Sequence, residues 1–309
     1  MAASVSGTFH GLPAAPLLRR AWAYAQLTRL NRPIGIALLL WPTLWALWMA
    51  ARMLPGAERA GTFAPLPSLK LLAVFVAGTV VMRSAGCVIN DFADRNIDPH
   101  VKRTRGRPLA SRRVSPQEAL VLFGVLVALA LWLVTRLDAL TVYYSFVGAA
   151  LTLSYPFMKR FFPLPQFYLG AAFGWAVPMA FVATLGDVPR AGWLVFIATL
   201  LWSGVYDTLY AMVDRDDDLK LGVQSTAIAF GDMDTLLVGV MQVMVLVAMG
   251  LAGRLVGMHW PFYASLGIAA ALFAWQQWIA RGREREACFR AFTHNHWVGL
   301  AIMAGVALG

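Results

Sequence analysis

Charged residues and cysteine are both scarce in this sequence, and each shortage excludes a class of protein. Charged residues make up 14% of the 309 residues and hydrophobic residues make up 59%, whereas a typical soluble chain has about 25% charged residues. The composition therefore excludes an ordinary water-soluble fold. The 2 cysteines do not suggest a disulfide framework or a thiolate metal site. A cleaved signal peptide is also not expected, because Pro13 and Pro16 interrupt the apolar residues near the N-terminus.

Long apolar runs recur along the whole chain. Nine of them contain roughly 17 to 23 residues, which is the length that crosses a bilayer as an α-helix. The sequence therefore predicts an all-α, polytopic membrane protein that forms a single embedded domain over residues 1–309. The nine predicted spans are 34–53, 69–90, 118–136, 139–157, 164–185, 191–213, 235–253, 259–280 and 293–309.

The basic residues orient these spans. If the N-terminus is cytoplasmic, the loops on that side hold 19 Lys and Arg residues, the opposite loops hold 6, and Arg83 remains inside the second span. The positive-inside rule therefore places residues 1–33 in the cytoplasm. In this segment Leu17 to Leu30 alternates apolar and basic residues, as an interfacial helix does. The lack of acidic residues before Glu58 leaves a transit peptide as a weaker alternative.

The stretch from Gly86 to Leu109 combines an acidic cluster with a basic one. If the second span continues as a helix, Asp91, Asp94 and Asp98 follow an i, i+3, i+7 spacing and share one face, with Asn90 at its edge. Oxygen ligands of this kind suit Mg²⁺, which often shares its coordination with a substrate phosphate. The basic residues that suit a diphosphate are Lys102, Arg103, Arg105 and Arg107.

A second acidic cluster lies at the end of the sixth span. Asp207, Tyr210, Asp214 and Asp218 follow an i, i+3, i+7, i+11 spacing on one helical face. Four spans separate the two clusters, so both are predicted to lie on the same side of the membrane. One cluster alone could be a solvated helix end. Two matched clusters favour a shared site, because a charged residue at the centre of a span costs roughly 2.5 to 3.5 kcal/mol.

Other polar and aromatic residues have simpler interpretations. Trp41, Trp45 and Trp48 form a stripe on the first helix that is typical of packing or of the membrane interface. His294 and His296 are two residues apart on a predicted helix, so they diverge and do not favour a metal site. The net charge of +10 does not indicate nucleic-acid binding, because the basic residues are dispersed among hydrophobic helices.

The two acidic motifs resemble those of a known family. Asn90-Asp-x-x-Asp-x-x-x-Asp98 and Asp207-x-x-Tyr-x-x-x-Asp-x-x-x-Asp218 look like the signature motifs of the UbiA superfamily of intramembrane aromatic prenyltransferases. Within this superfamily, Arg32-Pro-Ile-Gly and Tyr206-Asp-Thr-x-Tyr are most similar to the 4-hydroxybenzoate branch. The resemblance implies a ring-like bundle of about nine transmembrane helices. It also implies Mg²⁺-dependent transfer of a polyprenyl group from polyprenyl diphosphate to a ring carbon of 4-hydroxybenzoate in ubiquinone biosynthesis.

The resemblance and the residue chemistry together assign expected roles. The bacterial inner membrane would hold the protein, with the active site facing the cytoplasm. Arg29 is expected to bind the acceptor carboxylate, although a positive-inside flank is the simpler interpretation of this residue. Lys102, Arg103 and Arg107 are expected to assist departure of the diphosphate, and Tyr210 to bond it or a metal-bound water. The expected Mg²⁺ ligands, of which all but the asparagine are also expected to be catalytic, are Asn90, Asp91, Asp94, Asp98, Asp207, Asp214 and Asp218.

Two alternatives remain open at this level. A prenyltransferase for another aromatic acceptor, such as dihydroxynaphthoate, homogentisate or haem, would carry similar motifs. A cation or proton pathway would also place carboxylates in the membrane, but it predicts acidic residues spread through the membrane depth. Here they gather at one face, beside basic residues that suit a phosphate.

The charge asymmetry generates a topological prediction. In a variant without the native cysteines, single cysteines at positions 105 and 217 should react with a membrane-impermeant thiol reagent only from the cytoplasmic side. A cysteine at position 187, between the fifth and sixth spans, should react only from the other side. Reaction of positions 105 and 217 from opposite sides would mean an odd number of intervening spans, and the two clusters would not share a site.

Overall fold

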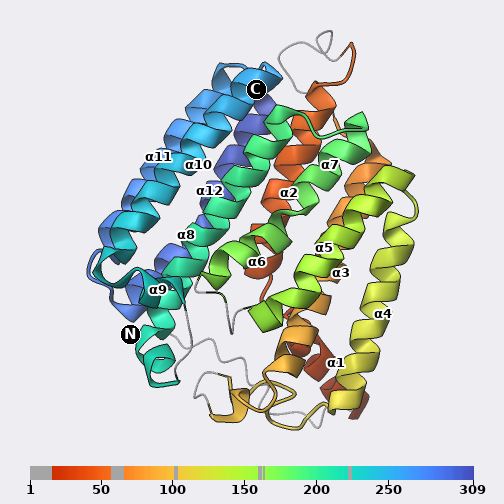
Figure 1. The fold of residues 1–309 in the computed structure, drawn as a ribbon, viewed down its shortest axis with the longest axis vertical. Helices are drawn as coiled ribbons and strands as arrows, with labels where there is room; N and C mark the ends of the chain where they lie inside the picture. Colours follow the sequence, from red (N-terminus) through yellow and green to blue (C-terminus); the bar gives the residue numbers. More distant parts are fainter. Residues whose placement is uncertain (1–15, 57–65, 101–103, 159–161, 163, 222–224) are drawn as a thin grey trace.

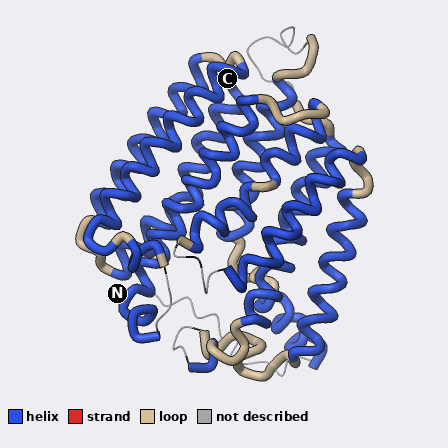
Figure 2. Tube along the Cα trace, viewed as in Figure 1, coloured by secondary structure: helices blue, strands red, loops and turns tan. Residues whose placement is uncertain are grey.

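The structure of the protein is a computed structural model that describes residues 16–56, 66–100, 104–158, 162, 164–221 and 225–309. Within these ranges the regular structure is entirely helical, which confirms the all-α prediction (Figure 2). The helices are α1 (Pro16–Leu27), α2 (Ile34–Arg52), α3 (Leu69–Ala93), α4 (Pro116–Val134), α5 (Ala139–Met158), α6 (Pro165–Gly174), α7 (Ala176–Leu185), α8 (Arg190–Leu221), α9 (Thr226–Ala229), α10 (Asp234–Val256), α11 (Trp260–Ala280) and α12 (Arg285–Leu308), with 3-10 turns η2 (Asp98–His100) and η3 (Gly231–Met233).

Each predicted span corresponds to a long helical segment in the described chain. Six of these segments are long and apolar enough to cross a membrane by length and mean hydropathy: α2, α3, α4, α6 with α7, α8, and η3 with α10. The fifth span is interrupted at Trp175, where α6 ends and α7 begins. The last helix has 24 residues and begins at Arg285, eight positions before the predicted span. The chain is therefore a multi-pass membrane protein, and nine is an approximate number of spans.

The long helices lie side by side in one bundle (Figure 1). Helix α8 packs against α10, α12 and α6, while α11 packs against α10 and α12. On the other side of the bundle α3 packs against α4, and α5 packs against α6 and α7. The predicted interfacial helix is confirmed as a helix: α1 lies at the lower end of Figure 1, where it contacts α3. That lower end, at which α3 and α8 both finish, is called the motif end below.

Tryptophans of α2 join this helix to α8 and α12. The Trp45 ring lies 5.2 Å from the Trp202 ring, and the Trp45 indole N–H donates to the Gly299 carbonyl oxygen at 3.2 Å. The Trp202 indole N–H donates to Asn295 Oδ1 at 2.9 Å. Because buried indoles need such partners, these contacts fix how the three helices pack. The packing interpretation of the tryptophan stripe is confirmed for Trp45.

The two histidines of α12 diverge, as their spacing predicts. His296 lies 5.5 Å from the Trp41 ring and accepts its indole N–H at 3.2 Å, whereas His294 lies 4.2 Å from the Trp275 ring. They therefore contact different helices, α2 and α11. In the part of the chain that the structure describes, no group of three or more His, Cys, Asp or Glu side chains is arranged to hold a metal ion.

Close packing of α11 against α12 generates a stability prediction. A Cβ atom at Gly305 would overlap the Ser265 side chain and lie 3.2 Å from the Phe262 Cα atom. Gly305→Ala should therefore destabilise the protein by about 1 to 3 kcal/mol, the usual cost of overpacking a well-packed interior. The effect should appear as a lower thermal unfolding temperature in detergent.

Gly267→Ala is the matched control on α11, since a Cβ there meets nothing within 4 Å. This control should be neutral or slightly stabilising, because alanine favours a helix interior over glycine by about 0.5 to 1 kcal/mol. Equal unfolding temperatures for the two variants would contradict the close approach of the helices.

Candidate active site

The two acidic motifs lie at the same end of the bundle. Helix α3 delivers Asn90 and Asp91 there, and α8 runs on to Leu221 and carries Asp207, Tyr210, Asp214 and Asp218 (Figure 1). Both motifs therefore lie at one end of the helical bundle, as a shared site requires. All four of these α8 side chains are half-buried.

The path of the first motif differs from the sequence expectation. Helix α3 ends at Ala93, and the chain continues through turns into η2, which begins at Asp98. Asp98 therefore does not share a helical face with Asp91, and that expectation was wrong. Pro99 provides a physical reason, because a residue that precedes proline is disfavoured in the α conformation. The turn instead brings the Asp98 carboxylate near Asp91, where both accept hydrogen bonds from Arg107. Helical spacing alone does not predict this proximity.

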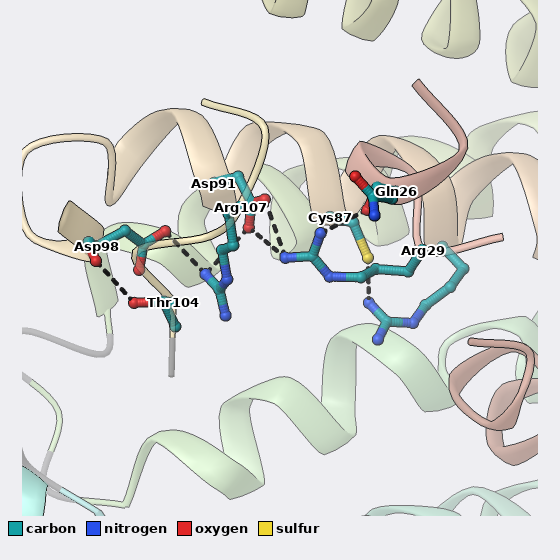
Figure 3. A network of polar contacts seen from close by, with 8 residues as sticks. Gln26, Arg29, Cys87, Asp91, Asp98, Thr104 and Arg107 are labelled. Atoms are coloured by element: carbon teal, nitrogen blue, oxygen red, sulfur yellow. Dashed lines mark hydrogen bonds and ion pairs between the residues drawn. The ribbon is translucent and has the colours of Figure 1, made fainter. Parts of the chain in front are cut away.

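Asp91 is held between two arginines. Its side chain is 1% exposed, and both of its oxygens accept hydrogen bonds from Arg29 Nη2 at 2.8 and 2.9 Å. Arg107 Nη1 donates to the Asp91 Oδ1 atom at 3.1 Å and to Asp98 Oδ2 at 2.9 Å. Figure 3 shows the two guanidinium groups directed toward the same carboxylate. The buried negative charge at Asp91 is thus compensated by groups from outside α3.

Arg107 contacts two carboxylates of the first motif and has Tyr210 of the second motif as a neighbour. Burial alone would lower the pKa of its guanidinium, but Asp91, Asp98 and Tyr210 outweigh burial and raise that pKa. The interaction with Tyr210 places Arg107 near the α8 motif as well as the α3 motif. The turn that carries Arg107 is also anchored, since Thr104 Oγ1 donates to the Asp98 carbonyl oxygen at 3.0 Å.

Arg29 reaches the site from the end of α1. Its backbone has a left-handed φ of 60°, which costs roughly 1 to 2 kcal/mol for a residue with a side chain. Arg29 Nη1 also donates to the Gln26 carbonyl oxygen at 2.7 Å. An unfavourable backbone conformation that is held by contacts of this kind often marks a functional position. In this structure the contact that it serves is the ion pair with Asp91.

Two residues near the acidic motifs were not among the sequence-based candidates. Tyr155 of α5 lies close enough to interact electrostatically with Asp94 and with Asp207, one residue from each motif. Arg83 of α3 interacts electrostatically with Asp207. The signal for Arg83 was present in the sequence, because an ionisable residue inside a span is by default a candidate functional residue. Tyr155 carried no such signal.

Contacts with neighbouring side chains hold the Arg83 guanidinium in place. Its Nη1 atom donates to Cys87 Sγ at 2.8 Å, and its Cζ atom lies 5.5 Å from the centre of the Phe173 ring. Its Nε atom is buried and has no hydrogen-bond partner among the described residues. A Cβ atom at Gly35 would lie 2.8 Å from Arg83 Nη2. Glycine at position 35 therefore leaves room for the guanidinium between α2 and α3.

The remaining predicted basic residues are less informative. Lys102 and Arg103 lie outside the described residues. Arg105 is exposed, whereas Arg107 is half-buried. Of the predicted basic residues that the structure describes in this loop, Arg107 is therefore the one in contact with the acidic motifs.

The donor set fits a hard divalent cation that also binds substrate. The side chains gathered at the motif end offer carboxylate and amide oxygens, which suit Mg²⁺ better than a softer metal. Mg²⁺ is commonly bound through one or two carboxylates together with waters and substrate phosphates. Such a site does not need the preformed three-residue cage that is absent among the described residues.

These features define the class of protein as an all-helical membrane protein with paired acidic motifs at one end. The model of the UbiA prenyltransferase family matches residues 39–299, so the chain belongs to the UbiA prenyltransferase family. It is 55% identical over 93% of its length to a 4-hydroxybenzoate octaprenyltransferase of Pseudomonas syringae pv. syringae, of which the match covers 93%. A protein of the same description from Alkalilimnicola ehrlichii is also 55% identical, over 94% of each chain.

Solved structures support the fold. A UbiA homolog from Aeropyrum pernix K1 has a TM-score of 0.74 and 26% sequence identity, and the match covers 87% of this chain and 96% of the homolog. A UbiA homolog from Archaeoglobus fulgidus, solved with bound GPP and Mg²⁺, has a TM-score of 0.67 at 15% identity, with 91% of this chain and 99% of the homolog covered. The second likeness shows the shared fold alone.

Proposed function

We propose that this protein transfers a polyprenyl group from a polyprenyl diphosphate to a ring carbon of 4-hydroxybenzoate, as a step of ubiquinone biosynthesis. The observation that carries the proposal is the convergence of both acidic motifs and Arg107 at one end of the helical bundle. Relatives that are 55% identical over nearly the whole chain are described as 4-hydroxybenzoate octaprenyltransferases. The same reasoning supports a single catalytic domain over residues 1–309.

We infer that Mg²⁺ is the cofactor. When bound, it would supply positive charge to the diphosphate oxygens. The residues that would hold it are those of the two motifs: Asn90, Asp91, Asp94, Asp98, Asp207, Asp214 and Asp218. Asp91 has a distinct part among them, because Arg29 and Arg107 already occupy both of its oxygens. Asp91 is therefore proposed to hold these two arginines in place as well.

The basic residues are proposed to bind and stabilise the leaving diphosphate. Arg107 is placed for this by its ion pairs with Asp91 and Asp98, and its guanidinium is cationic at physiological pH. Lys102 and Arg103 precede it in the same loop and are proposed to act with it. A preorganised cation near developing negative charge needs little rearrangement during the reaction, which is the condition for strong electrostatic stabilisation. Tyr210 is proposed to donate to the diphosphate or to a nearby water.

In the proposed reaction, the bond between the allylic carbon and the diphosphate oxygen breaks, and its electron pair leaves with the diphosphate. The ring carbon beside the phenol oxygen then bonds to the allylic carbon. Loss of the proton on that ring carbon restores aromaticity. Apolar side chains from the surrounding helices exclude water, which would otherwise capture the allylic cation.

The membrane placement of this site is also a proposal. The relatives are bacterial proteins, six helical segments of the described chain are long and apolar enough to cross a membrane, and the positive-inside rule favours a cytoplasmic motif end. We therefore propose a multi-pass protein of the bacterial inner membrane whose active site faces the cytoplasm. Both substrates are compatible with this placement, because the polyprenyl chain partitions into the bilayer and 4-hydroxybenzoate is soluble.

The metal proposal predicts different effects for two carboxylates. Asp214→Ala should abolish prenyl transfer without unfolding the protein, measured with purified protein in lipid. Asp91→Ala should abolish it and also lower the unfolding temperature, because it leaves Arg29 and Arg107 without their buried partner. Excess chelator should also stop the reaction in the unaltered protein, and added Mg²⁺ should restore it. Asp187→Ala, in the loop between α7 and α8, is a matched carboxylate control that should keep activity. Substantial turnover in either motif variant or in chelator would reject the two-motif site.

The acceptor proposal predicts which arginine binds the carboxylate of 4-hydroxybenzoate. If Arg29 does, Arg29→Ala should raise the KM for the acceptor roughly ten- to a hundredfold, since a charge-assisted hydrogen bond contributes about 1.5 to 3 kcal/mol. The KM for the prenyl diphosphate should barely change. Arg29→Lys should recover part of the loss, because an ammonium cannot reproduce the planar contact.

Arg83 provides the competing assignment, since its buried Nε atom has no partner in the described chain whereas Arg29 is paired with Asp91. If Arg83→Ala, and not Arg29→Ala, raises the acceptor KM, the carboxylate site moves to Arg83. A panel with dihydroxynaphthoate and homogentisate as acceptors completes the test. Preference for either over 4-hydroxybenzoate would assign the chain to another acceptor.

A further inference from the structure

A buried carboxylate at the start of α10 forms a second set of ion pairs at the motif end. Asp234 has a relative exposure of 0%. Arg283, in the connection between α11 and α12, approaches Asp234 Oδ1 with Nε at 2.9 Å and with Nη2 at 2.8 Å. Arg215 of α8 donates to the Asp234 Oδ2 atom at 3.3 Å. Arg215, Asp234 and Arg283 are called the Asp234 cluster below.

The cluster is more elaborate than the start of a helix requires. Asp234 is the first residue of α10, after the N-cap residue Met233, and it accepts the adjacent Thr235 backbone N–H at 2.6 Å. This local contact alone would need neither arginine. Arg283 in addition adopts a left-handed backbone with φ of 56° and donates from Nη2 to the Asp232 carbonyl oxygen at 2.6 Å. A strained backbone with this many contacts indicates that its side-chain position matters.

The partner on α8 belongs to the second acidic motif. Arg215 directly follows Asp214 and precedes Asp216 in the sequence. Successive residues of an α-helix point about 100° apart, so Arg215 points about 100° away from Asp214 and about 60° away from Asp218. A contact that draws Arg215 toward α10 therefore also fixes the directions of these two carboxylates. Arg285 adds a looser tie on the same side, with Nη2 at 3.7 Å from Asp216 Oδ2. These ion pairs therefore restrict the rotation of the end of α8.

A second contact one to two turns earlier keeps α8 in the same register. The Thr208 and Thr226 hydroxyls are 2.7 Å apart, and the Thr226 N–H donates to Gln166 Oε1 at 3.0 Å. This contact joins α8 to α9 and α6 close to Asp207. The end of α8 is therefore attached at two levels, and the lower level is the Asp234 cluster.

We propose that the Asp234 cluster positions the second acidic motif: the Arg283–Asp234–Arg215 ion pairs set the rotation of the α8 end that presents Asp214 and Asp218 to the divalent cation and diphosphate. The inference rests on the proposed function of these carboxylates. The three cluster residues are positioning residues, since they contact α8, α10 and the α11–α12 connection. Through Arg283, the α11–α12 connection therefore also helps to position the second acidic motif.

The test is a direct measurement of metal binding. Mn²⁺ affinity is measured by electron paramagnetic resonance on the full-length protein in lipid nanodiscs, with a prenyl thiolodiphosphate that does not react. Arg283→Ala should weaken Mn²⁺ binding about ten- to a hundredfold, the usual range when groups that orient metal ligands are removed. In the transfer assay the same variant should need a correspondingly higher Mg²⁺ concentration, while the acceptor KM stays unchanged. Arg283→Lys should recover part of the affinity.

Arg281→Ala is the matched control. Arg281 lies in the same connection but is exposed, with its Cζ atom 5.7 Å from the centre of the Trp278 ring. This variant should bind Mn²⁺ as the unaltered protein does. If Arg283→Ala does not fold, Arg215→Gln provides the second variant, because Arg215 makes one longer bond to Asp234. A weakened Mn²⁺ affinity is expected there as well.

The outcomes separate positioning from simple stabilisation. A lower unfolding temperature with unchanged Mn²⁺ affinity in the folded Arg283→Ala or Arg215→Gln protein would overturn the proposal. A raised acceptor KM with unchanged metal affinity would overturn it too. If the unaltered protein bound no Mn²⁺ with the diphosphate analogue, the proposed function itself would fail, and this result is distinct from both.

Discussion

A carboxylate that is buried away from water must be paired with a cation, and this requirement determines how the motif end of the bundle is arranged. Desolvating a charge is costly, and an unpaired partner of a buried ion pair is more costly still. Asp91 and Asp234 are the most deeply buried carboxylates in this region, and each is paired with two arginines from distant segments. Their ion pairs connect α1, the α3–α4 loop, α8 and the α11–α12 connection. The half-buried carboxylates of both motifs belong to the helices and loops that the ion pairs of Asp91 and Asp234 join.

Much of this arrangement was predictable from the sequence because it depends on periodicity and counting. The apolar runs located each of the spans, since a bilayer requires a nearly constant length of apolar helix, although α8 and α12 extend eight residues beyond their predicted limits at one end. An even number of spans between Asp91 and Asp207 placed both motifs at one end. The α8 motif was predictable residue by residue, because an uninterrupted helix keeps Asp207, Tyr210, Asp214 and Asp218 at a fixed angular spacing.

The pairing of specific side chains was not predictable in this way. Arg29 and Asp91 are 62 positions apart, and no local pattern indicates which arginine will reach a given carboxylate. The position of Asp98 depended on where α3 ends, and helix ends are the least reliable part of any sequence-based prediction. Asp234 resembled an ordinary helix-start residue, and its two arginine partners come from separate parts of the chain. These contacts arise from tertiary packing, which a single sequence does not report.

The attachment of α1 has a consequence for how the protein experiences its membrane. This short helix lies at the motif end, buries Ala23 and Leu27 in a small apolar cluster with Val88 and Leu109, and ends just before Arg29. Arg19 on the same helix is exposed, whereas Arg20 is paired with Glu118 of α4. Basic side chains at an interface are attracted by anionic headgroups. The charge of the lipid surface therefore acts on α1. This helix ends just before Arg29, whose guanidinium contacts Asp91. On this basis we expect the charge of the lipid surface to influence the active site, and a detergent micelle without anionic lipid would lack that influence.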